Sequence, residues 1–112
     1  MKQGEEWHLQ SACIKWFRLQ YPQWMMFSVP MEAIWKNKNY FEGSGAMSGV
    51  SDTIILMDGR VLFVEFKSRY GRQSPVQVNF QKDVERLGFE YKVIKSFDEF
   101  QQYILNYDNT RY

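Results

Sequence analysis

Cysteine and histidine are almost absent from this chain of 112 residues, which has one of each, Cys13 and His8. A single cysteine excludes an internal disulfide and is typical of a protein in a reducing cytoplasm. Cys13 is better explained as a small buried hydrophobe on a helix than as a redox or metal-binding group. His8 has no cysteine or histidine partner at ligand spacing. The sequence therefore supports neither a zinc site nor a Ser/His/Asp triad.

Long apolar runs, linkers and nucleotide-binding glycine patterns are also missing. No apolar stretch approaches the ~20 residues of a membrane span, and the amino terminus has no apolar segment resembling a signal peptide. Gly43, Gly45 and Gly49 match neither a P-loop nor a dinucleotide fingerprint, so nucleotide binding has no support. They suggest a loop that lies close to backbone or ligand. No Pro/Gly/Ser linker divides the chain, and one domain over residues 1–112 is expected.

Positive charge is concentrated in one part of the chain. The formal net charge is only +1, but the region from Arg60 to Lys95 holds eight Lys or Arg against four Asp or Glu, a local net charge of +4. Such an excess suits a polyanionic substrate. A solvated basic face explains the same charges equally well.

Hydrophobic periodicity and capping residues predict a three-layer α/β arrangement. Ser74-Pro75 places Ser at an N-cap and Pro at the first helical position, and Ser96-x-x-Glu99 is a capping box. The strands at 51–57 and 61–67 are apolar on both faces, which indicates helices on both sides of the sheet. The strand–helix–strand succession over 61–94 predicts a crossover between parallel strands. The expected elements are a helix at 5–20, strands at 25–29, 51–57 and 61–67, a helix from 74 to Gly88, a strand at 91–94 and a helix opening at 96.

Each predicted helix has an apolar stripe at helical spacing that should face the core. These stripes are Leu9, Cys13, Trp16, Phe17 and Leu19 on the first helix, Val76, Phe80, Val84 and Leu87 on the second, and Phe97, Phe100, Ile104 and Tyr107 on the last.

The hairpin at 51–67 brings together the residues with the clearest chemical potential. Asp58-Gly59 predicts a two-residue type I′ turn, which needs φ > 0 at both central positions. Counting back from this turn pairs Asp52 with Glu65, at a Cβ separation of ~4.5–5.5 Å where like charges are destabilising. Lys67 lies two residues beyond Glu65 and projects from the same face. The spacing D-x12-E-x-K therefore predicts a metal site with a catalytic lysine beside it.

Two carboxylates in a basic surrounding favour Mg²⁺ or Mn²⁺, because these ions prefer hard oxygen ligands, waters and phosphate oxygens. The carbonyl of Phe66 is a further candidate ligand. Lys67 could hold or deprotonate the attacking water, or offset the negative charge that develops on the phosphate. The alternative is a simple salt bridge between Glu65 and Lys67, which leaves Asp52 unexplained.

Weaker candidates surround this hairpin. Glu6 could add a third carboxylate, although an acid in a first helical turn normally just complements the helix dipole. The start of the helix at Ser74 favours phosphate, and Gln77 in its first turn could bridge to metal-bound water or to Lys67. The predicted contacts to a nucleic-acid backbone are Arg69, Arg72, Gln73 and Ser74, where the arginines could equally be solvated.

Asp52, Glu65 and Lys67 resemble the active-site signature of the PD-(D/E)XK nuclease superfamily. The surrounding residues are similar to those of its VRR-NUC family, the virus-type replication-repair nucleases. The matching segments span most of the chain and are specific together, although D-x12-E-x-K alone is not. They are Glu6-x3-Gln10-x5-Trp16-Phe17-Arg18-Leu19-Gln20-Tyr21-Pro22, Gly45-x3-Gly49-Val50-Ser51-Asp52, Phe63-Val64-Glu65-Phe66-Lys67, Gly71-Arg72-Gln73-Ser74-Pro75-x-Gln77 and Gly88-x2-Tyr91 with Val93.

This resemblance implies a three-layer restriction-endonuclease-like fold, with a small mixed β-sheet flanked by helices. It also implies a Mg²⁺- or Mn²⁺-dependent DNA endonuclease acting on branched, Holliday-junction-like DNA in repair, in the cytoplasm of a bacterial or phage-infected host cell. Glu6 would then be a metal ligand and Gln77 a catalytic residue. Two alternatives stay open: a catalytically silent nucleic-acid-binding module of the same fold, and a nuclease acting on other DNA or RNA structures.

A homodimer is expected as well. One site makes one nick, whereas a four-way junction needs two symmetric cuts, which a stand-alone domain of this size delivers only as a two-fold dimer. Small stand-alone members of the VRR-NUC family look like homodimers that resolve such junctions, so the resemblance implies two metal sites on one basic face. Aromatic and Met residues are enriched at interfaces, although core packing could also use them. The candidates are Trp24, Met25, Met26, Trp35, Tyr40 and Phe41.

Overall fold

The structure is a computed structural model that describes residues 4–30, 36 and 43–109. Among these residues, no helix is long and apolar enough to cross a membrane. The elements follow the predicted order with small shifts at their ends. They are α1 (Glu5–Gln20), β1 (Met25–Ser28), β2 (Thr53–Met57), β3 (Arg60–Phe66), α4 (Pro75–Arg86), β4 (Glu90–Ile94) and α5 (Phe97–Asn109).

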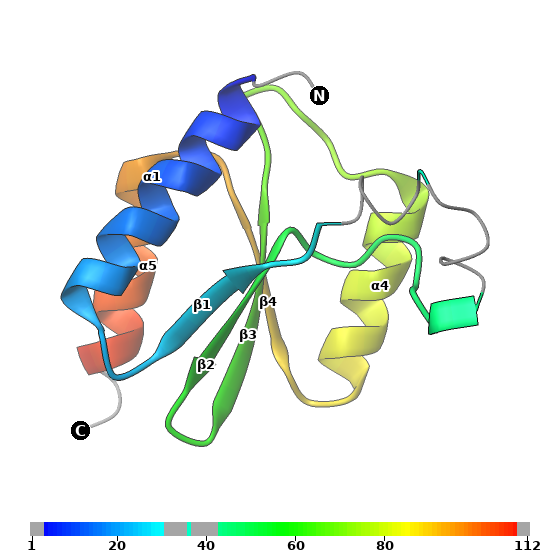
Figure 1. The fold of residues 1–112 in the computed structure, drawn as a ribbon. Coiled ribbons are helices and arrows are strands. Elements are labelled where there is room, and N and C mark those ends of the chain that lie inside the picture. Colours follow the sequence, from blue (N-terminus) through cyan, green and yellow to red (C-terminus); the bar gives the residue numbers. More distant parts are fainter. Residues whose placement is uncertain (1–3, 31–35, 37–42, 110–112) are drawn as a thin grey trace.

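One mixed sheet of four strands, in the order β1-β2-β3-β4, runs through the middle of the molecule (Figure 1). β1 and β2 pair antiparallel, as do β2 and β3, and β3 and β4 pair parallel as the crossover prediction requires. Met57 faces Arg60 across a two-residue loop, which confirms the predicted hairpin register. The turn type differs from the prediction. Gly59 has a φ of +69° while no described non-glycine residue has a positive φ, so Asp58 avoids the left-handed region that a type I′ turn demands.

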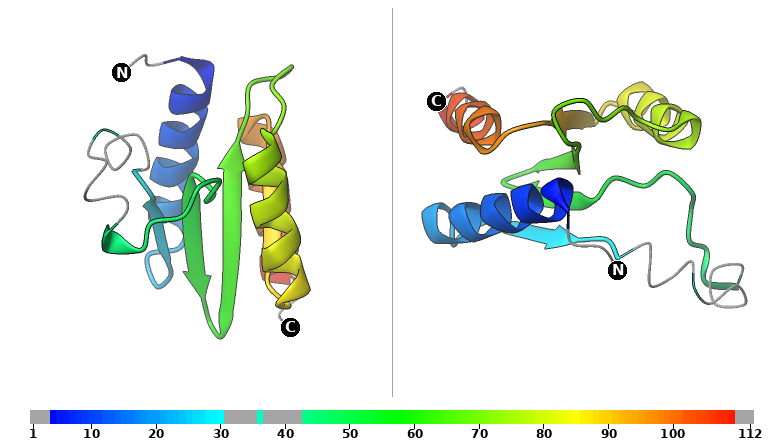
Figure 2. Two further views of the ribbon diagram at one scale, coloured as in Figure 1. Left: turned by 90° about the vertical axis from the view of Figure 1, so that its right-hand side faces the viewer. Right: turned by 90° about the horizontal axis from the view of Figure 1, so that it is seen from above.

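Helices cover both faces of the sheet, which confirms the three-layer α/β fold. α1 and α5 pack against each other on one side, and α4 lies on the other (Figures 1 and 2). The main core lies on the α1/α5 side. Cys13 is fully buried there, and burial raises the pKa of its thiol to about 12, as expected of an inert apolar contact. Other members of this core are Phe17, Ile55, Leu62, Val64, Phe66, Ile94, Phe100 and Ile104.

Four residues that the helical stripes predicted to face the core are exposed, and two of them belong to α4. α4 meets the sheet mainly through the Phe80 ring, which packs on Phe63 and Tyr91, and through buried Val84. All four stand in the first or last turn of a helix or at its cap, where a side chain has fewer neighbours to pack against. The prediction of burial was wrong for Leu19 (80% exposed), Val76 (47%), Leu87 (63%) and Phe97 (37%).

The ends of α4 follow the predicted local signals. Ser74 is the N-cap, and its Oγ accepts a hydrogen bond from the N–H of Gln77 while the Gln77 side-chain carbonyl accepts from the N–H of Ser74, a complete capping box. At the other end, Gly88 takes a φ of +91°. The N–H groups of Gly88 and Phe89 donate to the carbonyls of Glu85 and Val84, which is the Schellman pattern. α4 therefore has a defined start, and the loop before it is held at that point.

Candidate functional site

Asp52 stands immediately before β2 and continues the pairing between β2 and β3 with its side chain. Its Oδ2 accepts a hydrogen bond of 2.7 Å from the N–H of Phe66. Burial raises the pKa of Asp52 to about 6, the Phe66 N–H opposes this shift, and the charge of Glu65 adds to it. The N–H that Asp52 binds belongs to the residue after Glu65, so the two acids stand at neighbouring positions of the hairpin. The hairpin thus brings both acids to one place, as the register predicted.

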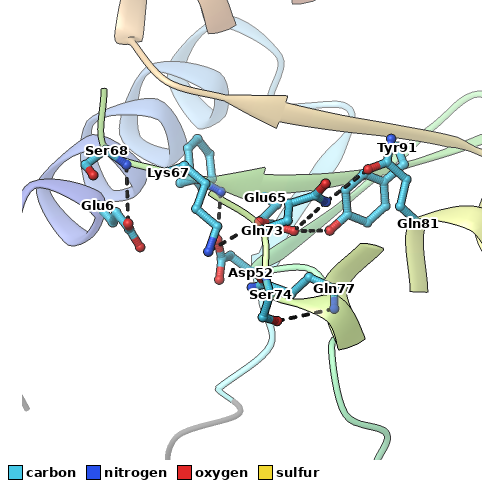
Figure 3. Close-up of polar contacts among 11 residues, drawn as sticks. Glu6, Asp52, Glu65, Lys67, Ser68, Gln73, Ser74, Gln77, Gln81 and Tyr91 are labelled. Carbon is cyan, nitrogen blue, oxygen red and sulfur yellow. Dashed lines mark hydrogen bonds and ion pairs between the residues drawn. The ribbon is translucent and has the colours of Figure 1, made fainter. Parts of the chain in front are cut away.

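Glu65 is fully buried in β3, and its two carboxylate oxygens are in different situations. Oε1 accepts hydrogen bonds from the hydroxyl of Tyr91 and from Nε2 of Gln73, the latter at 3.3 Å. Oε2 accepts no hydrogen bond from the described residues and lies 3.5 Å from Nζ of Lys67 (Figure 3). A buried charge normally has its lone pairs satisfied. Oε2 therefore has only the Lys67 ammonium as a partner among the described residues and lies near a second carboxylate, a position that suits a further cation.

Lys67 follows β3 and projects toward Glu65 as predicted, with its side chain 14% exposed. Its N–H donates to the carbonyl of Ile94, which extends the parallel pairing with β4 and fixes where the side chain starts. The ion pair of the alternative interpretation is present as a contact. A salt bridge alone does not explain why Oε2 lacks a hydrogen bond. It also does not explain why a second, partly buried carboxylate, Asp52, lies nearby.

Glu6 lies in the first turn of α1, and its Oε2 accepts a 3.3 Å hydrogen bond from the N–H of Ser68, next to Lys67. The charge of Glu6 also raises the pKa of Asp52, although it is the smallest of the causes. Within the described part of the chain, no three Asp, Glu, His or Cys side chains gather closely enough to hold an ion. Glu6 is thus near the carboxylate pair but not within ligand distance of both.

Of the residues predicted to contact DNA around the start of α4, some are exposed and others form hydrogen bonds within the protein. Arg69 and Arg72 are exposed on the loop after Lys67, and the guanidinium of Arg69 lies 5.3 Å from the centre of the Tyr70 ring. Gln73 is directed inward, to Glu65. Ser74 and Gln77 bond to each other in the capping box. Contacts of these residues with DNA, and of Gln77 with Lys67 or water, stay predictions.

Sequence reasoning missed two members of this cluster, Tyr91 and Gln81. Gln81 accepts a 2.9 Å hydrogen bond from Nε2 of Gln73. The hairpin turn gives no register for β3 and β4, so the position of Tyr91 came only from the structure: Tyr91 pairs with Phe63 in parallel strands, and paired residues share a face. Tyr91 therefore lies on the same face as Glu65, two residues away along the strand direction. No local pattern could have found Gln81, because the contact depends on how α4 docks.

Gly49 holds the segment before Asp52 against the start of α4, and its replacement gives a direct test of this arrangement. Gly49 has a φ of +82°, and an added Cβ would lie 2.3 Å from the carbonyl oxygen of Val76. Gly49→Ala is expected to lower the free energy of unfolding by at least about 2 kcal/mol, from left-handed strain and the clash together. Urea denaturation measures this loss.

Gly45→Ala is the matched control, because Gly45 has a similar φ of +81° but nothing within 4 Å of an added Cβ. The free energy of unfolding that Gly45→Ala loses therefore measures the backbone strain alone. If both variants lose the same stability, the close approach to α4 contributes nothing and the predicted packing is wrong.

Comparison with known proteins finds solved structures that have a similar fold. No protein-family model matches the sequence, and no curated protein matches it. A solved structure described as a VRR_NUC domain protein superposes with a TM-score of 0.71 at 21% identity, covering 96% of this chain and 90% of that chain. A second, described as a VRR_NUC domain, gives a TM-score of 0.67 at 21% identity, covering 91% of this chain and 96% of that chain. The chain therefore has the fold of VRR_NUC domain proteins over nearly its whole length.

Proposed function

We propose that this chain is a Mg²⁺- or Mn²⁺-dependent endonuclease of the VRR-NUC type that hydrolyses phosphodiester bonds in branched DNA. In this proposal residues 1–112 form one nuclease domain that acts in the cytoplasm. The observation that carries the proposal is the fully buried carboxylate of Glu65, whose Oε2 has a lysine and a second carboxylate beside it but accepts no hydrogen bond from the described residues. The fold shared with VRR_NUC domain proteins supports it.

The donor set fits a hard divalent cation. Asp52 and Glu65 offer carboxylate oxygens, including Oε2 of Glu65, which accepts no hydrogen bond from the described residues, and the Phe66 carbonyl and Glu6 are candidates for further or outer contacts. Mg²⁺ commonly binds through one or two carboxylates and keeps several waters, so a cluster of only two close acids is sufficient. A bound ion would supply a water of lowered pKa and a positive charge beside the phosphate. The like charges of Asp52 and Glu65 would then be neutralised.

The residues of the chain have separate tasks in this proposal. Asp52 and Glu65 would hold the ion, and the hydrogen bond from the Phe66 N–H orients the Asp52 carboxylate. Lys67, whose ammonium lies 3.5 Å from Oε2 of Glu65, would orient the attacking water and offset charge on the phosphate. Gln77 would help to orient water at the start of α4. Exposed Arg69 and Arg72, with Gln73 and Ser74, lie on the loop where the DNA backbone would enter.

A cleavage assay tests the function directly. End-labelled linear duplex, flap, fork and four-way-junction DNA, and an RNA of matched sequence, are incubated with the chain in Mn²⁺, in Mg²⁺ or in EDTA. Cleavage of branched DNA that EDTA abolishes is the expected result. Binding without cleavage in any metal would favour the silent module, and preferential cutting of RNA would favour a nuclease with a different substrate.

We further propose that the chain acts as a homodimer, although the structure removes two of the residues that the sequence offers for its interface. Trp24 and Met26 are 5% and 2% exposed and belong to the core, so they are not available for an interface. Met25 is 59% exposed and remains a candidate. The other three candidates, Trp35, Tyr40 and Phe41, lie outside the described residues.

Light scattering at assay concentration tests the dimer. A mass of two chains is expected, together with paired cuts in opposite strands of a four-way junction. A monomeric mass with only single nicks would contradict the dimer without affecting the assignment of the metal site.

A further inference from the structure

We propose that Tyr91 and Gln73 are positioning residues that hold Oε1 of Glu65 and thereby leave Oε2 as the oxygen for a divalent cation. Gln81 is part of the same device, because it holds the amide of Gln73. This inference rests on the proposed metal-dependent function and concerns residues that the catalytic prediction did not include. The sequence predicts a DNA contact for Gln73, whereas its inward direction gives it this different task.

The orientation of the Glu65 carboxylate is fixed by its hydrogen bonds. Both donors, the Tyr91 hydroxyl and the Gln73 amide, bond to the same oxygen, Oε1. Rotation of the carboxylate about its last bond would break both, so the plane of the group is fixed. Oε2 then stays directed at the Lys67 side of the site, where the ion pair of 3.5 Å lies (Figure 3).

Gln81 determines which way the Gln73 amide faces. Nε2 of Gln73 donates to Oε1 of Glu65 and also to Oε1 of Gln81, at 3.3 and 2.9 Å. A flipped Gln73 amide would turn its carbonyl toward a carboxylate and another carbonyl, which cannot donate. The amide of Gln81 is held in turn, because its Nε2 donates to Glu85 on the next turn of α4. A chain of hydrogen bonds therefore runs from the surface of α4 to the buried acid.

If Tyr91 and Gln73 served only to stabilise the buried Glu65, a different arrangement of hydrogen-bond donors would be expected. Burying a charged carboxylate is costly unless its lone pairs are satisfied, and a site selected for stability would give donors to both oxygens. Here two neutral donors share one oxygen, whereas the other has no hydrogen bond among the described residues and only the ion pair of 3.5 Å with Lys67. Groups that hydrogen-bond a metal ligand from behind, and so orient it toward the ion, are common around metal sites.

Tyr91→Phe tests the inference, because it removes the hydroxyl and keeps the ring that packs at 6.1 Å on Phe80. Mn²⁺ binding is measured by calorimetry on the chain alone, without DNA, and thermal unfolding is followed in EDTA. The expected result is a roughly tenfold loss of Mn²⁺ affinity with a folded protein. The rate of cleavage at saturating DNA should fall, with little change in the concentration of DNA needed for half-maximal rate.

Tyr103→Phe is the matched control. Its hydroxyl donates to a carboxylate oxygen of Glu90 at 2.6 Å, outside the site, so this variant loses the same kind of bond. Mn²⁺ affinity should equal that of the wild type. An equal loss in Tyr103→Phe, or wild-type affinity in Tyr91→Phe, would overturn the inference.

Gln81→Leu gives a second test that leaves the buried acid and its two donors in place. It should weaken Mn²⁺ binding in the same direction as Tyr91→Phe but less, and it keeps the inference testable if Tyr91→Phe does not fold. Unchanged affinity in Gln81→Leu would remove Gln81 from the device. A wild-type chain that binds no Mn²⁺ would overturn the proposed function and this inference together, whereas wild-type binding with unaffected variants overturns the inference only.

Discussion

Asp52→Asn is expected to abolish cleavage of branched DNA while the chain stays folded. The amide keeps an oxygen that can accept the 2.7 Å hydrogen bond from the Phe66 N–H, which Asp52→Ala would lose. It removes the negative charge that helps to hold the divalent ion. Loss of an ion that is worth several kcal/mol to the transition state lowers the rate on the order of 10³-fold or more. Single-turnover cleavage in Mn²⁺ measures this loss.

The stability of Asp52→Asn in EDTA should be equal to or greater than that of the wild type at pH 7 to 8. Burial and the charge of Glu65 raise the pKa of Asp52 to about 6, above its value in an unfolded chain, about 3.9. A carboxyl with a raised folded pKa costs stability when it is ionised. That cost is fully present above about pH 6 and disappears below the unfolded pKa, so a neutral amide avoids it.

Asp83→Asn is the control for the change in charge. Asp83 lies on α4, where its side chain is 62% exposed and pairs only loosely with Arg86 at 3.5 Å. This variant should cut DNA at the wild-type rate. Cleavage by Asp52→Asn at a rate near that of wild type, with Asp83→Asn as reference, would show that Asp52 does not hold the ion. Glu65→Gln provides a second substitution in the same pair and should also be inactive.

Lys67→Met is expected to lower turnover by about 100-fold or more, the size typical of a lost proton-transfer or charge-stabilising group. The methionine keeps most of the aliphatic stem in its partly buried position and removes only the ammonium. Mn²⁺ affinity of the free chain should not fall, because an ammonium cannot ligate a cation. It should instead rise, since Oε2 of Glu65 loses the positive charge 3.5 Å away that competes with the ion.

Lys92→Met is the matched control for Lys67→Met. The ammonium of Lys92 lies on neighbouring β4, 5.3 Å from the centre of the Tyr103 ring, and away from the carboxylate pair. Turnover and Mn²⁺ affinity should both be unchanged. Wild-type turnover in Lys67→Met together with weaker Mn²⁺ binding would contradict a catalytic role and support the simple salt bridge.

Local signals in the sequence predicted most of the elements of the fold. Caps and turns depend on interactions within a few residues, so Ser74-Pro75 correctly marked the start of α4 and Asp58-Gly59 marked the hairpin loop. The position of that loop then determined the register of β2 and β3. Because this register is correct, the sequence alone was enough to bring Asp52, Glu65 and Lys67 together.

Only the tertiary structure decided which residues surround Glu65 and which apolar side chains are buried. Tyr91 on β4 and Gln73 in the loop before α4 bond to the same oxygen of Glu65, and Gln81 joins them through the docking of α4. Likewise, Val76 and Leu87 fit the helical stripe but are exposed, whereas Phe80 on the same stripe packs on Phe63 and Tyr91 of the sheet. Periodicity reports which face of an element is apolar. How far that face reaches across its neighbour, and which atoms meet there, depends on the packing of segments that are distant in sequence.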